Sequence, residues 1–143
     1  MKKILLIIAS IVFTLTACAK QDRLINYREL PATAQEFIER HFNVTDISMI
    51  ERERDGIHFE YTVYLNDATE IDFGHQGNLK KIDCQIYPIP VGIVPDLITK
   101  YVTEHYPNHF IVEYEINNRS MKVELGNSVE LIFDLEGNFL RVD

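Results

Sequence analysis

The chain of 143 residues is poor in cysteine, with only Cys18 and Cys84, and it has no tryptophan. The residues around Cys18 indicate that this cysteine is modified, which leaves Cys84 without a partner for an internal disulfide. The fold must then be stabilised by a hydrophobic core even in an oxidising compartment. Cys84 lies on the apolar side of the alternating run Ile82-x-Cys84-x-Ile86, which predicts a small buried side chain.

Basic residues are also scarce, since 14 Lys and Arg stand against 22 Asp and Glu. Phosphate binding needs a basic stripe, so we expect no nucleic-acid partner. The excess of acid likewise opposes docking of the folded body on anionic lipid surfaces. The sequence contains neither a glycine-rich phosphate loop nor a serine or cysteine nucleophile beside a histidine in a recognisable motif, and we expect no cofactor.

Long apolar runs are missing except at the N-terminus, where Lys2 and Lys3 precede the apolar residues 4–15. The run ends in Leu15-Thr16-Ala17-Cys18, whose small residues give a signal peptidase access to the bond before Cys18. Such a segment is too short to span about 30 Å of hydrocarbon as a helix. It predicts a secretory signal peptide at residues 1–17 that ends in a lipobox.

This pattern resembles that of bacterial lipoproteins, which implies that Cys18 becomes the mature N-terminus and carries acyl chains. Residues 18–29 would form a lipidated tether, and the membrane would be held through the acyl chains on Cys18 alone. Ala19 in place of Asp after the cysteine implies sorting to the outer membrane, facing the periplasm. Without Lys2 and Lys3 the mature chain has 12 basic and 22 acidic residues, a formal charge of −10.

The remainder of the chain contains one module twice. One motif pair marks the helical part, with a shift of 64 residues, and two further pairs mark the strands, with a shift of 60. The first pair is Leu30-Pro31-x5-Phe37-Ile38-x2-His41-Phe42 and Val94-Pro95-x5-Tyr101-Val102-x2-His105-Tyr106. The others are Tyr61-x-Val63-x-Leu65 with Met121-x-Val123-x-Leu125, and Phe73-x3-Gly77-Asn78 with Phe133-x3-Gly137-Asn138. Repetition at this period indicates a duplicated supersecondary unit.

Each copy predicts one amphipathic helix followed by four strands. Apolar residues recur at helical spacing after Pro31 and Pro95, and the period then changes to two. Asn66-Asp67 and Gly126-Asn127 supply one tight turn in each copy, and Gly77 and Gly137, the latter at positive φ, supply the next. The first strands are expected near 47–53 and 110–116, and the alternation in 47–53 places apolar residues on both faces.

These elements predict an α+β fold. Two tandem α-β-β-β-β repeats, at about 30–84 and about 94–143, would form one continuous antiparallel sheet of about eight strands, with both helices packed on one face. The proline-rich connector 87–93 would be a packed, extended crossover.

The helix motif at 31–42, its copy ending in His105-Tyr106-Pro107, and the hairpin motifs resemble the β-lactamase-inhibitor-like, PepSY-like domains of bacterial lipoproteins and periplasmic proteins. The resemblance covers 30–143. It implies a curved antiparallel sheet with helices on one side. In the inhibitor that gives the family its name, the open sheet face grips an enzyme. Leu79 and Phe139 replace the family's usual tryptophan after Gly-Asn.

The polar face of the sheet is the candidate site, because Tyr64 and Ile132 are apolar bodies among acids that would steer a basic partner. We expect a non-catalytic binding module that inhibits or senses a protein or peptide partner. The partner-binding residues would be Glu60, Tyr64, Glu70 and Asp72 of the first copy and Lys122, Glu124, Glu130 and Ile132 of the second.

Two other functions stay open. A metal-dependent or carboxylate-based enzyme could use the paired acids or His105-x3-His109, although Pro107 between the histidines breaks the helical geometry. A carrier of a small apolar ligand would need space between helices and sheet, which large side chains such as Phe37, Phe73 and Tyr101 tend to fill.

Overall fold

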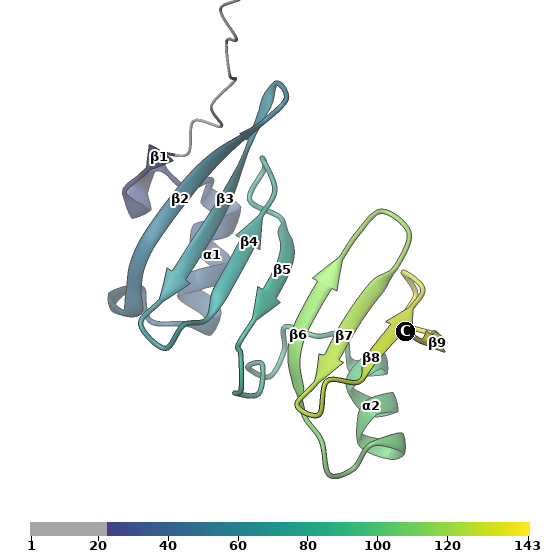
Figure 1. Ribbon diagram of the computed structural model, residues 1–143. Coiled ribbons are helices and arrows are strands. Elements are labelled where there is room, and N and C mark those ends of the chain that lie inside the picture. Colours follow the sequence, from purple (N-terminus) through teal and green to yellow (C-terminus); the bar gives the residue numbers. More distant parts are fainter. Residues whose placement is uncertain (1–22) are drawn as a thin grey trace, which may run out of the picture.

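The computed structural model describes residues 23–143 (Figure 1). Its strands form one antiparallel sheet in chain order from β1 to β9, and two helices precede the two groups of four long strands. The predicted α+β fold of two α-β-β-β-β repeats is therefore confirmed. The helices are α1 (Ala32–His41) and α2 (Asp96–His105), with short 3₁₀ helices η1 (Tyr27–Glu29) and η2 (Val44–Asp46). The strands are β1 (Arg23–Leu24), β2 (Ile47–Asp55), β3 (His58–Leu65), β4 (Glu70–Phe73), β5 (Leu79–Asp83), β6 (Ile111–Ile116), β7 (Met121–Leu125), β8 (Glu130–Phe133) and β9 (Phe139–Val142).

The ninth strand comes from the segment assigned to the tether. In β1, Arg23 and Leu24 pair with Arg52 and Glu51 of β2, and the Ile25 N–H donates to the Ile50 carbonyl over 3.0 Å. Ile25 is buried in the core. The distal part of the segment predicted as a tether, from Arg23 onward, thus packs with the fold. A two-residue strand is too short to leave a period in the sequence.

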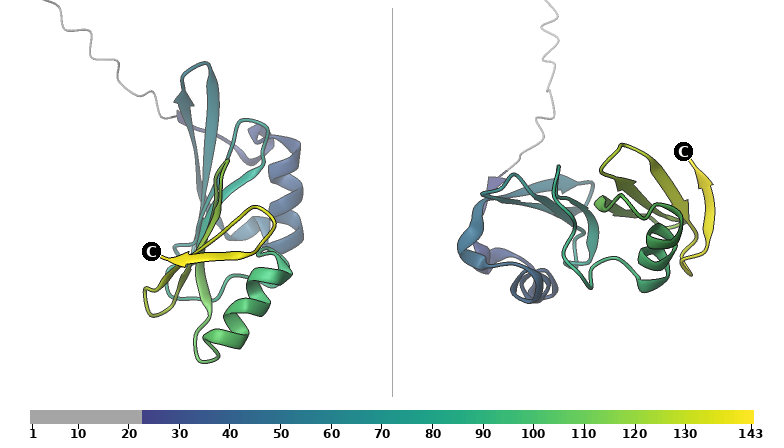
Figure 2. Two further views of the ribbon diagram at one scale, coloured as in Figure 1. Left: turned by 90° about the vertical axis from the view of Figure 1, so that its right-hand side faces the viewer. Right: turned by 90° about the horizontal axis from the view of Figure 1, so that it is seen from below.

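Both helices lie on the same side of the sheet (Figure 2). Each begins directly after a proline, and each buries two apolar residues one turn apart, Ala34 and Ile38 in α1 and Ile98 and Val102 in α2. Burying an isoleucine side chain stabilises by roughly 1.5–3 kcal/mol, so this stripe fixes the face that each helix presents to the sheet.

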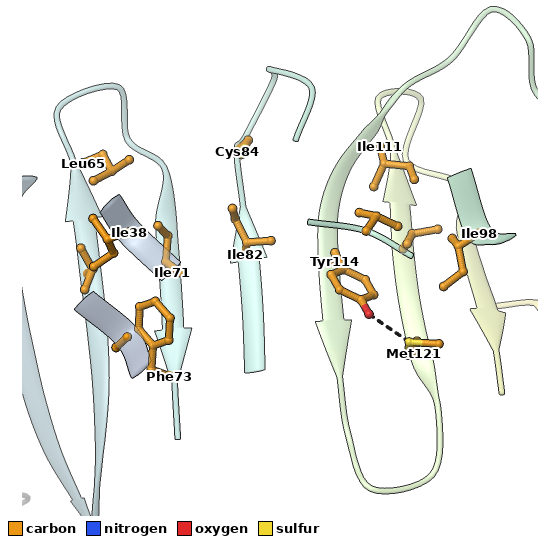
Figure 3. Close-up of a cluster of buried hydrophobic side chains, with 14 of the residues drawn as sticks. Ile38, Leu65, Ile71, Phe73, Ile82, Cys84, Ile98, Ile111, Tyr114 and Met121 are labelled. Carbon is orange, nitrogen blue, oxygen red and sulfur yellow. Dashed lines mark hydrogen bonds between the residues drawn. The ribbon is translucent and has the colours of Figure 1, made fainter. Parts of the chain in front are cut away.

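The core repeats the duplication in its contacts. The ring of Phe37 on α1 meets that of Phe73 on β4 edge-on at 5.6 Å, and Tyr101 on α2 meets Phe133 on β8 edge-on at 5.4 Å. These four residues are the corresponding positions of the two motifs. Buried side chains of both repeats form one cluster (Figure 3), in which the Tyr114 hydroxyl donates to Met121 Sδ over 2.9 Å.

The turns are partly as predicted. Gly77 and Gly137 have positive φ, 82° and 90°, between the last two strands of each repeat. The preceding turns differ, because the residues with positive φ are Ala68 (69°) and Ser128 (64°) rather than Asn66 or Gly126. The turn is one residue longer than a two-residue hairpin and ends in a left-handed residue, a common alternative.

The ambiguous first strand is explained by a register shift. β2 pairs with β3 continuously except for an irregularity between Ile47 and Met49, so its two ends cannot follow one alternation. β2 and β3 have 9 and 8 residues, whereas β6 and β7 have 6 and 5. The change of the repeat shift from 64 to 60 residues therefore falls in the β2–β3 hairpin, which is longer than its copy.

The two repeats join through β5 and β6. Lys81, Ile82 and Asp83 pair with Glu115, Tyr114 and Glu113. The connector beyond β5 continues along the same strand, because the Cys84 N–H donates to the Val112 carbonyl and the Ile89 N–H to the Ile111 carbonyl. One sheet thus runs through both copies.

Candidate functional site

The polar face of the sheet lies opposite the helices, and strand register arranges its side chains in rows. Directly paired residues share a face, so a row can be followed from strand to strand. The first row, across β2 to β9, is Glu51, Thr62, Asp72, Lys81, Glu115, Lys122, Ile132 and Arg141. The second row, across β3 to β8, is Tyr64, Glu70, Asp83, Glu113, Glu124 and Glu130. The second row contains five acids and no base.

The first repeat's half of this face forms a groove of about 1090 Å³. Its floor is made by β2 to β5, and its far end is closed by the β6–β7 turn. We call it the sheet groove. Its lining includes the predicted residues Glu60, Tyr64, Glu70 and Asp72, together with Glu51, Glu53, Thr62, Lys80, Lys81 and Glu115.

Two neighbouring carboxylates in the sheet groove are held where ionisation is disfavoured. Burial raises the pKa of Asp72, although the Thr62 hydroxyl donates to its Oδ1 over 2.8 Å and Lys81 lies nearby. Burial and the Asp72 charge likewise raise the pKa of Glu70. Among residues 23–143 Glu70 forms no ion pair within 4 Å, so it is available to a cation from outside.

Tyr64 is the aromatic side chain at the centre of this acid group. Its hydroxyl donates to Glu51 Oε2 over 3.3 Å. Burial, with the charges of Glu70 and Glu51, raises its pKa to about 12, so the phenol stays protonated at neutral pH. A half-buried tyrosine combines a flat apolar ring with a polar end, which is typical of binding anchors.

Lys80 closes one wall of the groove through an ion pair with Glu60, at 2.6 Å. The alternation of β5 would direct Lys80 to the opposite face from Lys81. The register shift between Asp72 and Phe73 brings both lysines to the polar face. No sequence period indicates this bulge, so Lys80 was missed.

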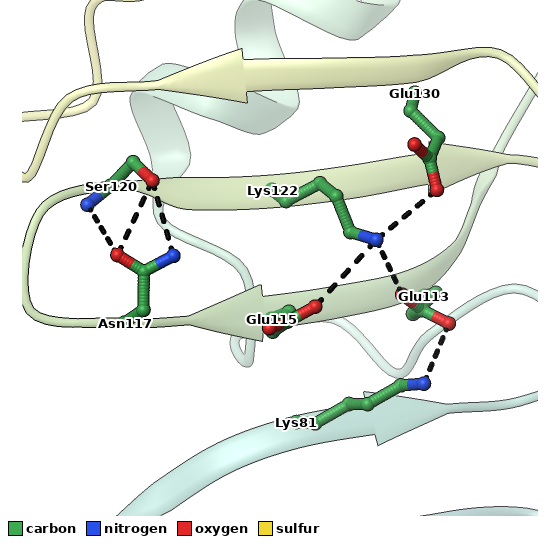
Figure 4. A network of polar contacts seen from close by, with 7 residues as sticks. All are labelled: Lys81, Glu113, Glu115, Asn117, Ser120, Lys122 and Glu130. Atoms are coloured by element: carbon green, nitrogen blue, oxygen red, sulfur yellow. Dashed lines mark hydrogen bonds and ion pairs between the residues drawn. The ribbon is translucent and has the colours of Figure 1, made fainter. Parts of the chain in front are cut away.

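In the second repeat the predicted residues form an internal ion network instead of a groove (Figure 4). Lys122 Nζ lies 3.4 Å from Glu113, 3.6 Å from Glu115 and 3.1 Å from Glu130. Glu113 also pairs with Lys81 at 2.9 Å and thereby joins the repeats. Burial acts to lower the pKa of Lys122, but hydrogen bonds to Glu130 and the Glu113 charge outweigh it and raise this pKa.

Ile132 is not an exposed anchor, which corrects the expectation for this residue. It retains only 6% exposure. Its direct cross-strand neighbours are Lys122 and Arg141, whose aliphatic stems can cover it. Alternation alone predicts exposure for a single apolar residue in a polar row, because it does not show which long side chains lie beside that residue.

The structure thus separates the eight predicted residues. Glu60, Tyr64, Glu70 and Asp72 come together in the sheet groove, and Lys122 and Glu130 belong to the ion network. Glu124 lies in the acidic row beside Glu113. The predicted lipidation residue Cys18 lies outside the described residues.

Sites for the alternative functions have little support in the described part of the chain. His105 Nδ1 contacts the Tyr101 carbonyl at 2.9 Å, and His109 faces Asn127, so this histidine pair does not converge. Residues 23–143 bring together no group of three or more His, Cys, Asp or Glu that could hold a metal. The rings of Tyr101, Phe133 and Phe139 pack against one another between α2 and the sheet, where a carrier would need space.

No helix among the described residues is both long and apolar enough to cross a bilayer. Cys84 is a buried free thiol, as predicted, and burial raises its pKa.

Solved structures of similar proteins cover nearly the whole chain. A "putative calcium-regulated periplasmic protein" of Bacteroides thetaiotaomicron is 33% identical with a TM-score of 0.81, covering 85% of this chain and 96% of that one. A "putative periplasmic protein" of Bacteroides vulgatus is 32% identical with a TM-score of 0.82, covering 87% and 98%. Another from the same species, described as of unknown function, is 32% identical with a TM-score of 0.80, covering 85% and 98%. Their periplasmic descriptions support export of this chain.

None of the curated proteins matches the chain. A family model does match, over residues 15–60 and 59–141, and its description is "Putative beta-lactamase-inhibitor-like, PepSY-like". The order of elements, the duplicated helix-to-strand contacts and this match agree. The chain therefore belongs to the beta-lactamase-inhibitor-like, PepSY-like family.

Proposed function

We propose that this protein is a non-catalytic binding module of the cell envelope, and that its sheet groove receives a basic segment of a protein partner. The observation that carries this proposal is the group of carboxylates around Tyr64, in which Glu70 and Asp72 are partly buried and Glu70 has no ion-pair partner among residues 23–143. Burial of a carboxylate is unfavourable unless a cation compensates it. A lysine or arginine of the partner would supply that cation.

The shape of the site favours an extended segment or a loop. On a sheet face whose strands lie about 5 Å apart, each row offers side chains at regular intervals across the strands. Tyr64 would contact the apolar part of the partner, and Lys80 and Lys81 would disfavour segments whose positive charges are wrongly spaced. The groove therefore supports selectivity beyond simple attraction between charges.

Calcium regulation is part of the description of the Bacteroides thetaiotaomicron protein, and in this chain the acidic turn between β8 and β9 has another role. Asp134 is the first acid of the sequence Asp134-Leu135-Glu136-Gly137-Asn138. Its carboxylate accepts hydrogen bonds from the backbone of Glu136 and Asn138 and from the Asn138 side chain. These hydrogen bonds stabilise the β8–β9 turn and lower the pKa of Asp134.

We further propose that the protein is anchored by acyl chains on Cys18, on the periplasmic side of the outer membrane. The lipobox Leu15-Thr16-Ala17-Cys18 and Ala19 support this. Mass spectrometry of the mature N-terminus tests the anchor, because acylation adds a defined mass to Cys18. A Cys18→Ser chain should lose this mass and leave the membrane fraction.

Capture of partners from envelope extract, with identification by mass spectrometry, tests the groove. The wild-type protein should retain a defined set of partners, and Glu70→Lys or Tyr64→Ala should lose it. Glu104→Lys is the matched control, since it makes the same change of charge on exposed α2, on the other side of the sheet. Equal recovery of every partner by wild type, Glu70→Lys and Tyr64→Ala would contradict a role for the groove.

A further inference from the structure

The register of β1 shows in which direction the chain leads toward its N-terminus. β1 runs antiparallel to β2, with Arg23 beside Arg52 and Leu24 beside Glu51. A step back along β1 is thus a step forward along β2, toward the tip of the β2–β3 hairpin. The chain enters the fold from the side of that tip (Figure 1).

The distance between the anchor and the fold is short. Cys18 precedes Arg23 by five residues, and Ile57 at the hairpin tip follows Arg52 by five residues. Five residues span at most roughly 17 Å, whatever conformation they adopt. An acylated Cys18 would therefore hold the hairpin tip close to the headgroup layer of the bilayer.

The hairpin is also the place where the two repeats differ. β2 and β3 exceed their counterparts β6 and β7 by three residues each. The extension therefore belongs to the repeat that follows the proposed anchor. Figure 1 shows this hairpin projecting past the β4–β5 turn.

The tip carries side chains suited to an interface between water and lipid. Ile57 is 85% exposed, and Phe59, two residues after it, is also exposed. Arginines lie on the same side of the hairpin as Phe59, since Arg54 pairs with Phe59 and Arg52 with Arg23. An apolar tip with arginines behind it is typical of segments that enter a headgroup layer.

These arginines are positioned by contacts within the hairpin. The Arg52 guanidinium lies 4.6 Å above the Phe59 ring, and Arg54 Nε donates to the Gly56 carbonyl over 3.0 Å. Guanidinium groups bind phosphate oxygens in a fork geometry. Acids are present as well: Glu53 and Asp55 alternate with the arginines on the other face of β2, and the Glu29 charge lies near Arg23 and Arg52. The arginines face away from the acidic sheet groove.

We propose that the tip of the β2–β3 hairpin inserts Ile57 into the headgroup region of the bilayer that holds Cys18, with Arg52 and Arg54 contacting lipid phosphates. This inference rests on the proposed acylation of Cys18. It replaces the expectation, based on net charge, that the acyl chains alone touch the membrane. Net charge describes the whole body, whereas the hairpin tip is apolar and basic on one side.

The lack of tryptophan makes a direct test possible, because a single introduced tryptophan reports its own surroundings. Ile57→Trp would be expressed as the lipoprotein and reconstituted in vesicles of phosphatidylethanolamine and phosphatidylglycerol. Val91→Trp is the matched control, since Val91 is fully exposed in the connector between β5 and α2, away from the hairpin. Both changes are at exposed sites and should leave the circular dichroism spectrum unchanged.

In vesicles, the tryptophan of Ile57→Trp should emit at shorter wavelength than it does in buffer once proteolysis has removed the lipidated segment. Brominated lipids in the vesicles should quench its fluorescence. Val91→Trp should show neither change. Vesicle-bound Ile57→Trp that is no better quenched than Val91→Trp would overturn the hairpin contact while leaving the anchor intact. Failure of wild type and both variants to float with vesicles, with no acyl mass on Cys18, would overturn the anchor and the hairpin contact together.

Discussion

At the scale of single residues, Asp72 belongs to the proposed binding groove although the partial burial of its carboxylate is unfavourable for the folded state. Its carboxylate is partly buried, with Glu60 nearby and one hydrogen bond from Thr62. Natural proteins often keep such unfavourable groups where a ligand will compensate them. The pKa of Asp72 is raised for this reason, mainly by burial.

The direction of this shift predicts a pH dependence of stability. The unfolded carboxyl has a pKa of about 3.9. Between that value and the higher pKa of the folded state, the folded protein binds more protons, so its stability falls as pH rises through this window. Asp72→Asn removes this effect and keeps an oxygen for Thr62. We expect a gain on the order of 0.5 kcal/mol in the free energy of unfolding at pH 7, and none below about pH 4.

Urea denaturation at both pH values measures this gain. Asp55→Asn, an exposed change at the end of β2, serves as the control and should shift stability less. A loss of stability in Asp72→Asn at pH 7 would show that the Thr62 hydrogen bond to a charged acceptor outweighs burial.

At the scale of elements, the turn between the last two strands of each repeat packs against the N-terminal end of that repeat's helix. A Cβ on Gly77 would lie 2.7 Å from the Ala34 backbone nitrogen, and one on Gly137 would lie 3.2 Å from Leu97 Cβ. Both glycines also have positive φ. The duplicated Gly-Asn motif therefore serves a contact between turn and helix as well as the turn itself.

Three glycine-to-alanine changes separate these two requirements. Gly56 has φ of 60°, and a Cβ there would have no neighbour within 4 Å. Gly56→Ala should therefore lower the free energy of unfolding only by the cost of left-handed backbone strain, roughly 1–2 kcal/mol. Gly137→Ala should lose slightly more. Gly77→Ala meets backbone and should lose the most, on the order of 3 kcal/mol. Thermal unfolding gives this order, and equal losses at all three sites would contradict a role for the helix contact.

Element types and their order could be predicted because the duplicated pattern gives each period twice. Strand β1 could not, since two residues have no period, and the turns at Ala68 and Ser128 could not, since their sequences also suit shorter hairpins. Half of the site was predicted, namely the groove residues of β3 and β4. Lys80 and the burial of Ile132 depend on a bulge and on neighbouring side-chain length, neither of which alternation encodes.

At the scale of the whole molecule, the two repeats act as one body through the β5–β6 seam. Their buried side chains form a single cluster. On the polar face, Glu113 is 8% exposed and pairs with Lys81 of the first repeat and Lys122 of the second. We therefore expect one cooperative unfolding transition for both repeats.

Glu113→Gln tests the seam. It leaves two lysines without their shared carboxylate, and breaking a buried pair is strongly destabilising, so we expect a loss of roughly 2 kcal/mol. Glu124→Gln is the control in the same acidic row, and it should change stability little. Calorimetry of both variants checks this. Two separate transitions in the wild-type protein, or equal stabilities of the two variants, would show that the repeats are not coupled through Glu113.

The direction of β1 bears on the orientation of the molecule relative to the bilayer. If the β2–β3 hairpin points its tip toward the lipid, these strands stand roughly perpendicular to the bilayer. The acidic sheet groove then opens parallel to the membrane surface instead of toward the cell interior. Access is then lateral. The partners best placed to enter are other envelope proteins whose basic segments lie at the same height above the bilayer.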